Sequence, residues 1–257
     1  MCVMTDQKTK AEHFRKLHVA GNPVVLFNVW DAGSAKTVTS AGARAVATSS
    51  WAVAQSLGFS DGEKTPVDLV IENLGRIVQA TELPVTVDLE SGYGDDPQTV
   101  GESIARAIGA GAVGCNLEDS YPATGKLRAA AEQGLRIQSA RQAAEASKVR
   151  FFINARCDVF FQPSKEPVSA LIGQTIDRAN LYVQAGADGL FLPGLADIAV
   201  ISQIAKASSL PLNILVGGKG PSVSALSEVG VARISYGGTP YADTMKAFED
   251  AARKAHG

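Results

Sequence analysis

The sequence predicts an α/β protein of the (β/α)₈ TIM-barrel class, folded as a single domain over residues 1–257 with an N-terminal helix. The chain has 257 residues, which is the usual size of one such barrel. Short apolar runs recur along it, and several lack the polar alternation of half-exposed strands. Such runs are typical of parallel strands covered on both faces, and alanine-rich stretches with helical spacing lie between them.

The elements follow in a regular order. A polar amphipathic helix is expected over about residues 8–20, and helices such as 128–147 and 174–185 are expected between the strands. Three helices should end at an Ala–Gly step, where glycine suits a left-handed C-cap. A doubly wound open sheet is the alternative, but residues 27–35 lack its usual glycine-rich turn. The eight expected strands are 24–28, 45–49, 85–88, 113–118, 151–154, 189–192, 212–216 and 232–235.

Composition excludes several classes of function. A formal net charge of −2 favours neither a nucleic-acid partner nor a membrane-surface partner. No apolar run is long enough to span a bilayer, and the first residues lack the apolar core of a signal peptide. The three cysteines have no metal-ligand spacing, so a reducing, cytoplasmic location is expected. None of the three histidines, His13, His18 and His256, ends an expected strand, which disfavours a histidine-built zinc site or a Ser–His–Asp site.

Acidic residues instead follow the third and fourth expected strands. Barrel active sites lie at the carboxyl ends of the strands. Asp88 and Glu90 are two residues apart and can face the same way, and Glu118 ends the neighbouring strand. Clustered carboxylates suit a hard cation, so we expect a Mg²⁺ site, which Mn²⁺ could also fill. The alternative is that these acids cap helices or pair with basic residues.

Other rim residues complete the expected site. Arg156 could grip a substrate carboxylate with two hydrogen bonds, or it could simply neutralise Glu118 or Asp158. Ser49 and Ser50 could donate to a developing oxyanion, or they could be ordinary turn residues. Trp30 follows the first strand and is a candidate substrate contact.

The loop over residues 51–66 carries Asp61 between two glycines, which suits either a lid or a rigid surface loop. Asp31 is expected to cap the helix that follows the first strand. Two glycine-rich turns, 217–220 and 236–238, lie where barrels commonly bind phosphate.

Taken together, these stretches resemble the phosphoenolpyruvate mutase/isocitrate lyase superfamily. The motifs, in family order, are "FNVWDAGSA", "TSS…LGFSDGE", "VDLESGYGD", "GAVGCNLEDS", "INARCDV" and "AGADGLFLPG". The resemblance implies Asp88 as a direct Mg²⁺ ligand, with Glu90 and Glu118 acting mainly through water. It also implies that Arg156 holds a substrate carboxylate, with Ser49 and Ser50 beside the substrate oxygens.

The resemblance further places Asp61 on a gating loop. It implies that the last helix is exchanged between subunits of a dimer or tetramer. Members of the superfamily break or rearrange C–C or P–C bonds of small 2-oxo or 2-hydroxy acids through a metal-stabilised, pyruvate-like enolate.

The sequence departs from the family pattern after the fourth strand. The stretch "EDSYPATGKL" lacks the cysteine of the isocitrate and methylisocitrate lyases, so those two activities are not expected. The lysine and asparagine of the mutases and phosphonopyruvate hydrolases are replaced by Ala123 and Gly125, with Lys126 displaced. Pro193 stands where the mutase has a histidine. Lys126 or Tyr121 could supply the missing group.

The expected function is therefore a Mg²⁺-dependent lyase that cleaves a C–C bond of a small 2-oxo or 2-hydroxy di-acid, acting as a homo-oligomer on a small carboxylate substrate. P–C bond chemistry on phosphonopyruvate or phosphoenolpyruvate is the nearest alternative. A phosphosugar isomerase or synthase, which would bind phosphate at the two glycine-rich turns, is an alternative of another class. A non-catalytic family member, which would bind metal without turnover, is the third.

Overall fold

The eight expected strands form one parallel sheet that curves into a barrel. The computed structural model describes residues 2–217 and 220–257, with side chains from Asp6 onward. The strand order is β1-β8-β7-β6-β5-β4-β3-β2, and a parallel bridge between Val29 and Thr48 joins the two ends of the sheet. This arrangement confirms the predicted fold class. The strands are β1 Val24–Leu26, β2 Val46–Ala47, β3 Val85–Asp88, β4 Gly114–Glu118, β5 Phe152–Arg156, β6 Gly189–Leu192, β7 Leu212–Leu215 and β8 Arg233–Ser235.

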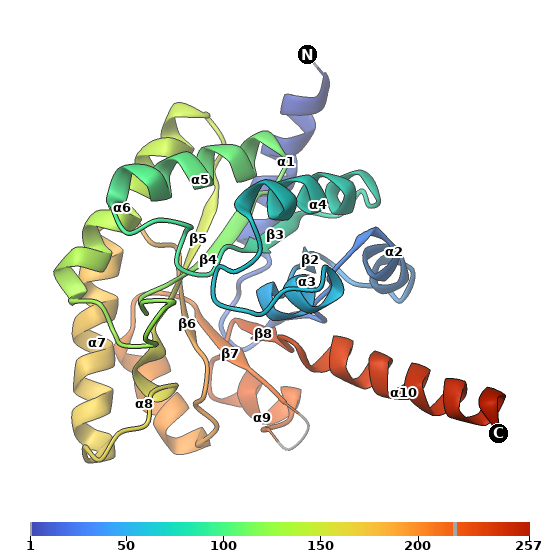
Figure 1. Ribbon diagram of the computed structural model, residues 1–257. Coiled ribbons are helices and arrows are strands. Elements are labelled where there is room, and N and C mark those ends of the chain that lie inside the picture. Colours follow the sequence, from blue (N-terminus) through green and yellow to red (C-terminus); the bar gives the residue numbers. More distant parts are fainter. Residues whose placement is uncertain (1, 218–219) are drawn as a thin grey trace.

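Helices surround the barrel and connect its strands (Figure 1). Their apolar faces pack on the sheet, as in α4 and α5, which bury Leu74, Ile77 and Ile104. The helices are α1 Cys2–Lys16, α2 Ala32–Ser40, α3 Ser50–Ser56, α4 Val67–Gln79, α5 Pro97–Gly109, α6 Ala130–Ala146, α7 Val168–Gln184, α8 Ile198–Ala207, α9 Val223–Glu228 and α10 Thr239–His256, with a 3₁₀ turn η1 at Asp158–Phe160.

Helix boundaries agree with the sequence signals where those signals are strong. Gly42, Gly111 and Gly186 have φ values of +90°, +99° and +101°, which confirms the predicted left-handed turns after α2, α5 and α7. Asp31 caps α2 by accepting a hydrogen bond from the Ser34 backbone N–H, also as predicted.

The bounds of two helices differ from the prediction by several residues. Helix α1 begins at Cys2 rather than near residue 8. Helix α1 ends at Lys16 rather than near residue 20, because the chain turns there toward Pro23 and β1. Helix α7 begins at Val168, six residues before the expected start, directly after Pro167. Proline is favoured at helix N-termini because its missing N–H and fixed φ cost nothing there.

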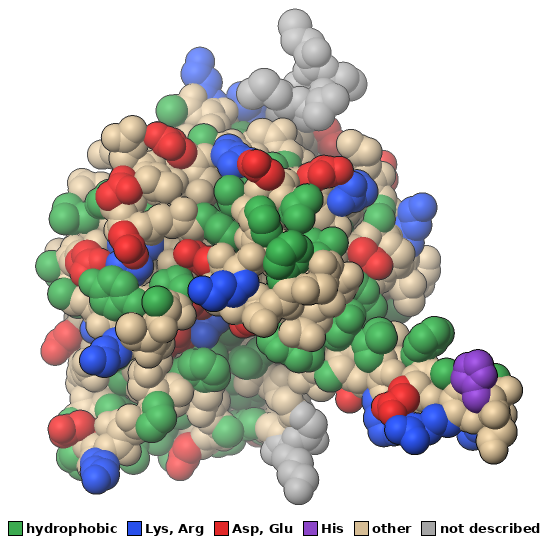
Figure 2. Space-filling model, in the orientation of Figure 1, with side chains coloured by type: hydrophobic (Ala, Val, Ile, Leu, Met, Phe, Trp, Pro, Cys, Tyr) green, Lys and Arg blue, Asp and Glu red, His purple; other side chains and the backbone are tan. Residues whose placement is uncertain are grey.

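The last helix, α10, extends away from the barrel (Figure 1). Within it only Pro240 is buried, and Phe248 is 68% exposed. Figure 2 shows hydrophobic side chains along this projecting helix, next to charged ones at its end. The outer face of β1 is correspondingly uncovered: Val25 and Phe27 line a groove of about 310 Å³. No described helix is long and apolar enough to cross a membrane.

Candidate active site at the carboxyl end of the barrel

The carboxyl ends of β3, β4 and β5 bring the predicted acids and arginine together. Strand register places Asp88 beside Asn116 on β4, and Glu118 beside Arg156 on β5. Glu90 and Glu118 are buried, at 4% and 9% exposure. Burying several carboxylates at one end of a barrel is costly unless cations or hydrogen bonds compensate.

Asp88 has one carboxylate oxygen in use and one free. Its Oδ2 accepts a hydrogen bond from the Ser50 backbone N–H at 3.2 Å. Its own N–H donates to Thr48 Oγ1 at 2.9 Å, which ties β3 to the end of β2. Its Oδ1 is buried and has no hydrogen-bond partner. A buried carboxylate oxygen without a donor is what a cation ligand looks like when no cation is present.

Glu90 is held by the protein on both oxygens. It has a left-handed backbone, with φ +52°. Its Oε2 accepts from the Glu63 N–H at 2.6 Å and its Oε1 accepts from the Tyr93 hydroxyl at 3.1 Å. Burial, together with the nearby charge of Asp61, raises the pKa of Glu90 to about 7.

Arg156 bridges two acids. Its Nη1 lies 2.7 Å from Glu118 Oε2, its Nε donates to Asp158 Oδ1 at 2.6 Å, and its Nη2 donates to Asp158 Oδ2 at 3.2 Å. The alternative role of Arg156 as a neutralising partner is therefore present in the structure. A guanidinium has five N–H donors, so two remain for a substrate carboxylate. Burial outweighs this pairing and raises the pKa of Glu118 to about 8.

A metal held directly by three acids does not match this geometry. Over residues 2–217 and 220–257, no three His, Cys, Asp or Glu side chains group closely enough to bind one ion. Mg²⁺, however, commonly takes only one or two carboxylates and keeps several waters. The unpartnered oxygen of Asp88 fits one direct contact, while Glu90 and Glu118 are already hydrogen-bonded and fit contacts through water.

The serines and Asp61 lie beside Asp88. Ser49 is the N-cap of α3, and its hydroxyl accepts from the Ala52 N–H at 3.4 Å. The Ser50 N–H is already used by Asp88. Asp61 lies close to Ser50, Asp88 and Arg156: its pKa is raised by burial and by Asp88, and lowered less by a hydrogen bond from Ser50 and by the charge of Arg156.

Three other candidates are placed less favourably. Trp30 packs edge-on against Tyr241 of α10, with ring centroids 5.0 Å apart. Lys126 is exposed, and its backbone forms hydrogen bonds with Tyr121 and Thr124 in the turn after β4. The Tyr121 hydroxyl donates to Glu132 at 2.9 Å, so it is directed toward α6 rather than the carboxylates.

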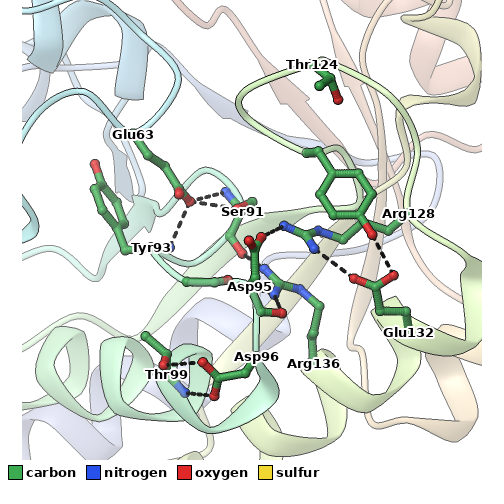
Figure 3. A network of polar contacts seen from close by, with 12 residues as sticks. Glu63, Ser91, Tyr93, Asp95, Asp96, Thr99, Thr124, Arg128, Glu132 and Arg136 are labelled. Atoms are coloured by element: carbon green, nitrogen blue, oxygen red, sulfur yellow. Dashed lines mark hydrogen bonds and ion pairs between the residues drawn. The ribbon is translucent and has the colours of Figure 1, made fainter.

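The predicted loop over residues 51–66 is wrong in its first part. Residues 50–56 form helix α3, because Ser49 supplies an N-cap and "WAVAQS" follows with good helix formers. The remaining loop, 57–66, is anchored by Glu63, as Figure 3 shows. Glu63 Oε1 accepts from the Ser91 N–H at 3.1 Å, the Ser91 hydroxyl at 2.7 Å and the Tyr93 N–H at 2.8 Å. This anchor was not predicted, although Glu63 belongs to the "LGFSDGE" motif.

A second missed residue is Asp119, which follows Glu118 and is fully buried. Its Oδ1 accepts from the Asp158 N–H at 2.9 Å. Its Oδ2 accepts from Arg178 Nη1 at 3.0 Å and from the Tyr182 hydroxyl at 2.7 Å, both on α7. Asp119 thereby fixes the turn that carries Asp158, the partner of Arg156. No pattern in the sequence pairs residues this far apart.

The expected phosphate loops receive little support. Residues 218–219 of the first turn lie outside the described residues. In the second, the N–H groups of Tyr236 and Gly237 both donate to Asn28 Oδ1 at 2.9 Å, so they are not available to a phosphate. Cys115 and Cys157 are buried free thiols.

Comparison with known proteins places this site in a family. Residues 14–256 match the phosphoenolpyruvate phosphomutase family. An uncharacterised protein of Mycobacterium tuberculosis (strain H37Rv) is 33% identical over 240 residues, covering 93% of this chain and 87% of that protein. The 2-methylisocitrate lyase of Escherichia coli K12 is 29% identical over 203 residues, covering 77% of this chain and 67% of the lyase.

A solved structure from Burkholderia cenocepacia J2315, provisionally assigned as a phosphonomutase, is 51% identical with a TM-score of 0.94. The match covers 97% of this chain and 99% of that one. Relatives in the superfamily therefore include lyases and mutases. The chain belongs to the phosphoenolpyruvate phosphomutase family, within the phosphoenolpyruvate mutase/isocitrate lyase superfamily that its motifs resemble.

Proposed function

We propose that this protein is a Mg²⁺-dependent lyase that cleaves a C–C bond of a small 2-oxo or 2-hydroxy di-acid. The observation that carries the proposal is the unpartnered, buried Oδ1 of Asp88, which lies among the residues that end β3, β4 and β5. Asp88 can bind a cation and Arg156 can bind a carboxylate. Together they suit a substrate that carries both a carboxylate and an oxygen able to take up negative charge.

The residues divide the work as follows. Arg156, already oriented by Asp158, uses its two remaining N–H donors to hold the substrate carboxylate. A Mg²⁺ ion at Asp88 would supply Lewis-acid stabilisation of the negative charge that develops on the substrate oxygen. Glu90 and Glu118 orient the waters around such an ion, since their direct hydrogen-bonding capacity is largely used by Tyr93, the Glu63 N–H and Arg156.

Asp61 is the group we assign to proton transfer. Burial and the charge of Asp88 raise its pKa, which favours the protonated carboxyl, and its position near Ser50 and Asp88 suits proton transfer to the substrate oxygens. The 57–66 loop, held by Glu63, keeps bulk water from the site. A groove of about 320 Å³ lies between this loop and the turn at Tyr121.

P–C bond chemistry on phosphonopyruvate or phosphoenolpyruvate is the second candidate. It is supported by the 51% identity to the provisionally assigned phosphonomutase. Methylisocitrate lyase activity is not proposed, because the stretch after β4 lacks the cysteine of those enzymes. The phosphosugar alternative loses support because Asn28 occupies the N–H groups of the turn after β8.

The assembly is part of the same proposal. The exposed side chains of Phe248 and Met245 on α10, and the uncovered outer face of β1, suit a homo-oligomer in which the last helix packs on a neighbouring subunit. Mn²⁺ could replace Mg²⁺, since both accept oxygen ligands.

The test is a turnover screen of 2-oxo and 2-hydroxy di-acids and phosphonopyruvate in the presence of Mg²⁺. We expect cleavage of at least one di-acid, with loss of about 100-fold or more in Asp88→Ala. Asp68→Ala is the matched control, because Asp68 is an exposed acid on α4, and it should keep the native rate. Native turnover by Asp88→Ala would contradict the proposal, and turnover of phosphonopyruvate alone would select the second candidate.

A further inference from the structure

The interior of this barrel is unusually polar below the site. Barrel interiors are normally filled by bulky branched apolar side chains. Here four polar side chains are almost completely buried on strands β4, β5, β7 and β8, none more than 5% exposed. They are Asn116, Asn154, Asn213 and Arg233.

Arg233 crosses this interior. Its strand, β8, lies four positions from β4 in the order of eight strands, so the two face each other across the barrel. Arg233 Nη2 nevertheless donates to Asn116 Oδ1 on β4 at 3.1 Å. The same oxygen accepts from Asn154 Nδ2 at 2.9 Å. The guanidinium is therefore held near the barrel axis, next to the floor of the site.

This cation has no anionic partner in contact with it. Among the described residues, no carboxylate lies within ion-pair distance of Arg233, and its Nε and Nη1 have no hydrogen-bond partner. Burying an unpaired charge costs several kcal/mol of folding free energy, so Arg233 does not serve to stabilise the fold. Burial lowers its pKa to about 10, with Asp88 acting in the opposite direction, so it stays charged at neutral pH.

Asn116 sets the position of the Arg233 guanidinium along the barrel axis. Strand register places Asn116 directly beside Asp88. Asn116 thus acts as a spacer that brings the positive charge to the level of Asp88 without giving Asp88 a hydrogen bond. A direct salt bridge would have occupied Asp88 Oδ1, the atom that is left free.

The charge balance above this floor is strongly negative. Besides burial, the charge of Asp88 raises the pKa values of Asp61, Glu90 and Glu118. Asp158 also raises the pKa of Glu118, and the charge of Arg156 lowers the pKa values of Asp61 and Glu118. Positive charge in addition to Arg156 and a bound Mg²⁺ would favour the binding of an anionic substrate to such a site.

We propose that Arg233 is a fixed positive charge beneath the active site that strengthens binding of the anionic substrate without touching it. This inference rests on the proposed function. The same charge repels a cation, so Arg233 must lower the affinity for the metal while it raises the affinity for the substrate anion. A residue that only fills space or orders the barrel would change both affinities in the same direction.

The test uses Mg²⁺ alone and oxalate, a small anionic mimic of a pyruvate enolate, as probes in calorimetric titrations at pH 8.5. In Arg233→Gln, which keeps a donor for Asn116, oxalate should bind to the Mg²⁺-saturated protein about tenfold more weakly. Mg²⁺ alone should bind as tightly as in the wild type or more tightly. Arg150→Gln is the charge-matched control, since Arg150 is exposed and pairs with Glu12, and it should change neither affinity.

Arg233→Lys provides a second measurement on a conservative variant, should Arg233→Gln fail to fold. A buried lysine loses its charge well below its usual pKa. Oxalate affinity of Arg233→Lys, measured from pH 6 to 10, should therefore be lost at a lower pH than that of the wild type. Equal pH profiles, or a parallel loss of both affinities in Arg233→Gln, would overturn the inference alone. A wild-type protein that binds neither probe would overturn the proposed function and this inference with it.

Discussion

Glu63 offers the most direct test of how the site is held together. The change is Glu63→Ala, which removes the acceptor shared by the Ser91 N–H, the Ser91 hydroxyl and the Tyr93 N–H. Ser91 is fully buried, so water does not readily replace the lost acceptor. Each buried N–H left unsatisfied costs about 1–3 kcal/mol. Two such groups, partly relieved because Glu63 itself is half-exposed, give a loss of about 2–4 kcal/mol.

For a chain of this size, 1 kcal/mol corresponds to a Tm shift of about 2–4 °C. Thermal unfolding followed by circular dichroism should therefore show Glu63→Ala melting about 4–16 °C below the wild type. Limited proteolysis should cut the 57–66 loop faster. Glu63→Gln keeps one acceptor oxygen in place and should lose about half as much stability.

Glu72→Ala is the control for this measurement. Glu72 pairs with Arg76 on the exposed face of α4 at 2.7 Å, and such surface pairs contribute about 0.5 kcal/mol or less. If Glu63→Ala were no less stable than Glu72→Ala, the loop would not depend on this carboxylate, and the reasoning would be refuted.

Two further predictions concern the buried acids. Because burial raises the folded-state pKa of Glu90 from 4.5 to about 7, its ionisation destabilises the metal-free protein as pH rises through this window. The stability of Glu90→Gln relative to the wild type should therefore increase by about 2–4 kcal/mol between pH 5 and pH 8.5. Urea unfolding curves recorded in EDTA measure this difference in the free energy of unfolding. A difference that stays constant with pH would contradict the prediction. Tyr182→Phe removes the 2.7 Å hydrogen bond to Asp119. It should cost about 1.5–3 kcal/mol and weaken oxalate binding through the turn that carries Asp158, whereas unchanged oxalate affinity would show that this turn does not depend on α7.

Much of the fold could be predicted because its signals are local. Apolar runs without alternation marked the strands, and the Ala–Gly steps marked helix ends whose left-handed φ values are confirmed at Gly42, Gly111 and Gly186. Helix α3 was not predicted, although Ser49 is a good N-cap, because the glycines that follow it are typical of a long loop. The start of α7 was missed because "SKEPVSA" resembles a loop until Pro167 is recognised as a helix N-cap.

The site could be predicted only in part. Strand-end positions identified Asp88, Glu90, Glu118 and Arg156, since parallel strands end at the same rim. Contacts between distant segments could not be predicted in this way. The sequence "VARIS" indicates a strand but not that Arg233 reaches Asn116 across the barrel, because that depends on closure and register.

The central claim is that a divalent cation binds at Asp88 and, with Arg156, completes a site for a small dicarboxylate. The most direct measurement is thermal unfolding of the wild type and Asp88→Ala with Mg²⁺ alone, oxalate alone, and both together. We predict that the wild type is stabilised most by both ligands together, with a cooperative increase, and that Asp88→Ala shows no response to Mg²⁺. Equal stabilisation of the two proteins by Mg²⁺ and oxalate would contradict the account.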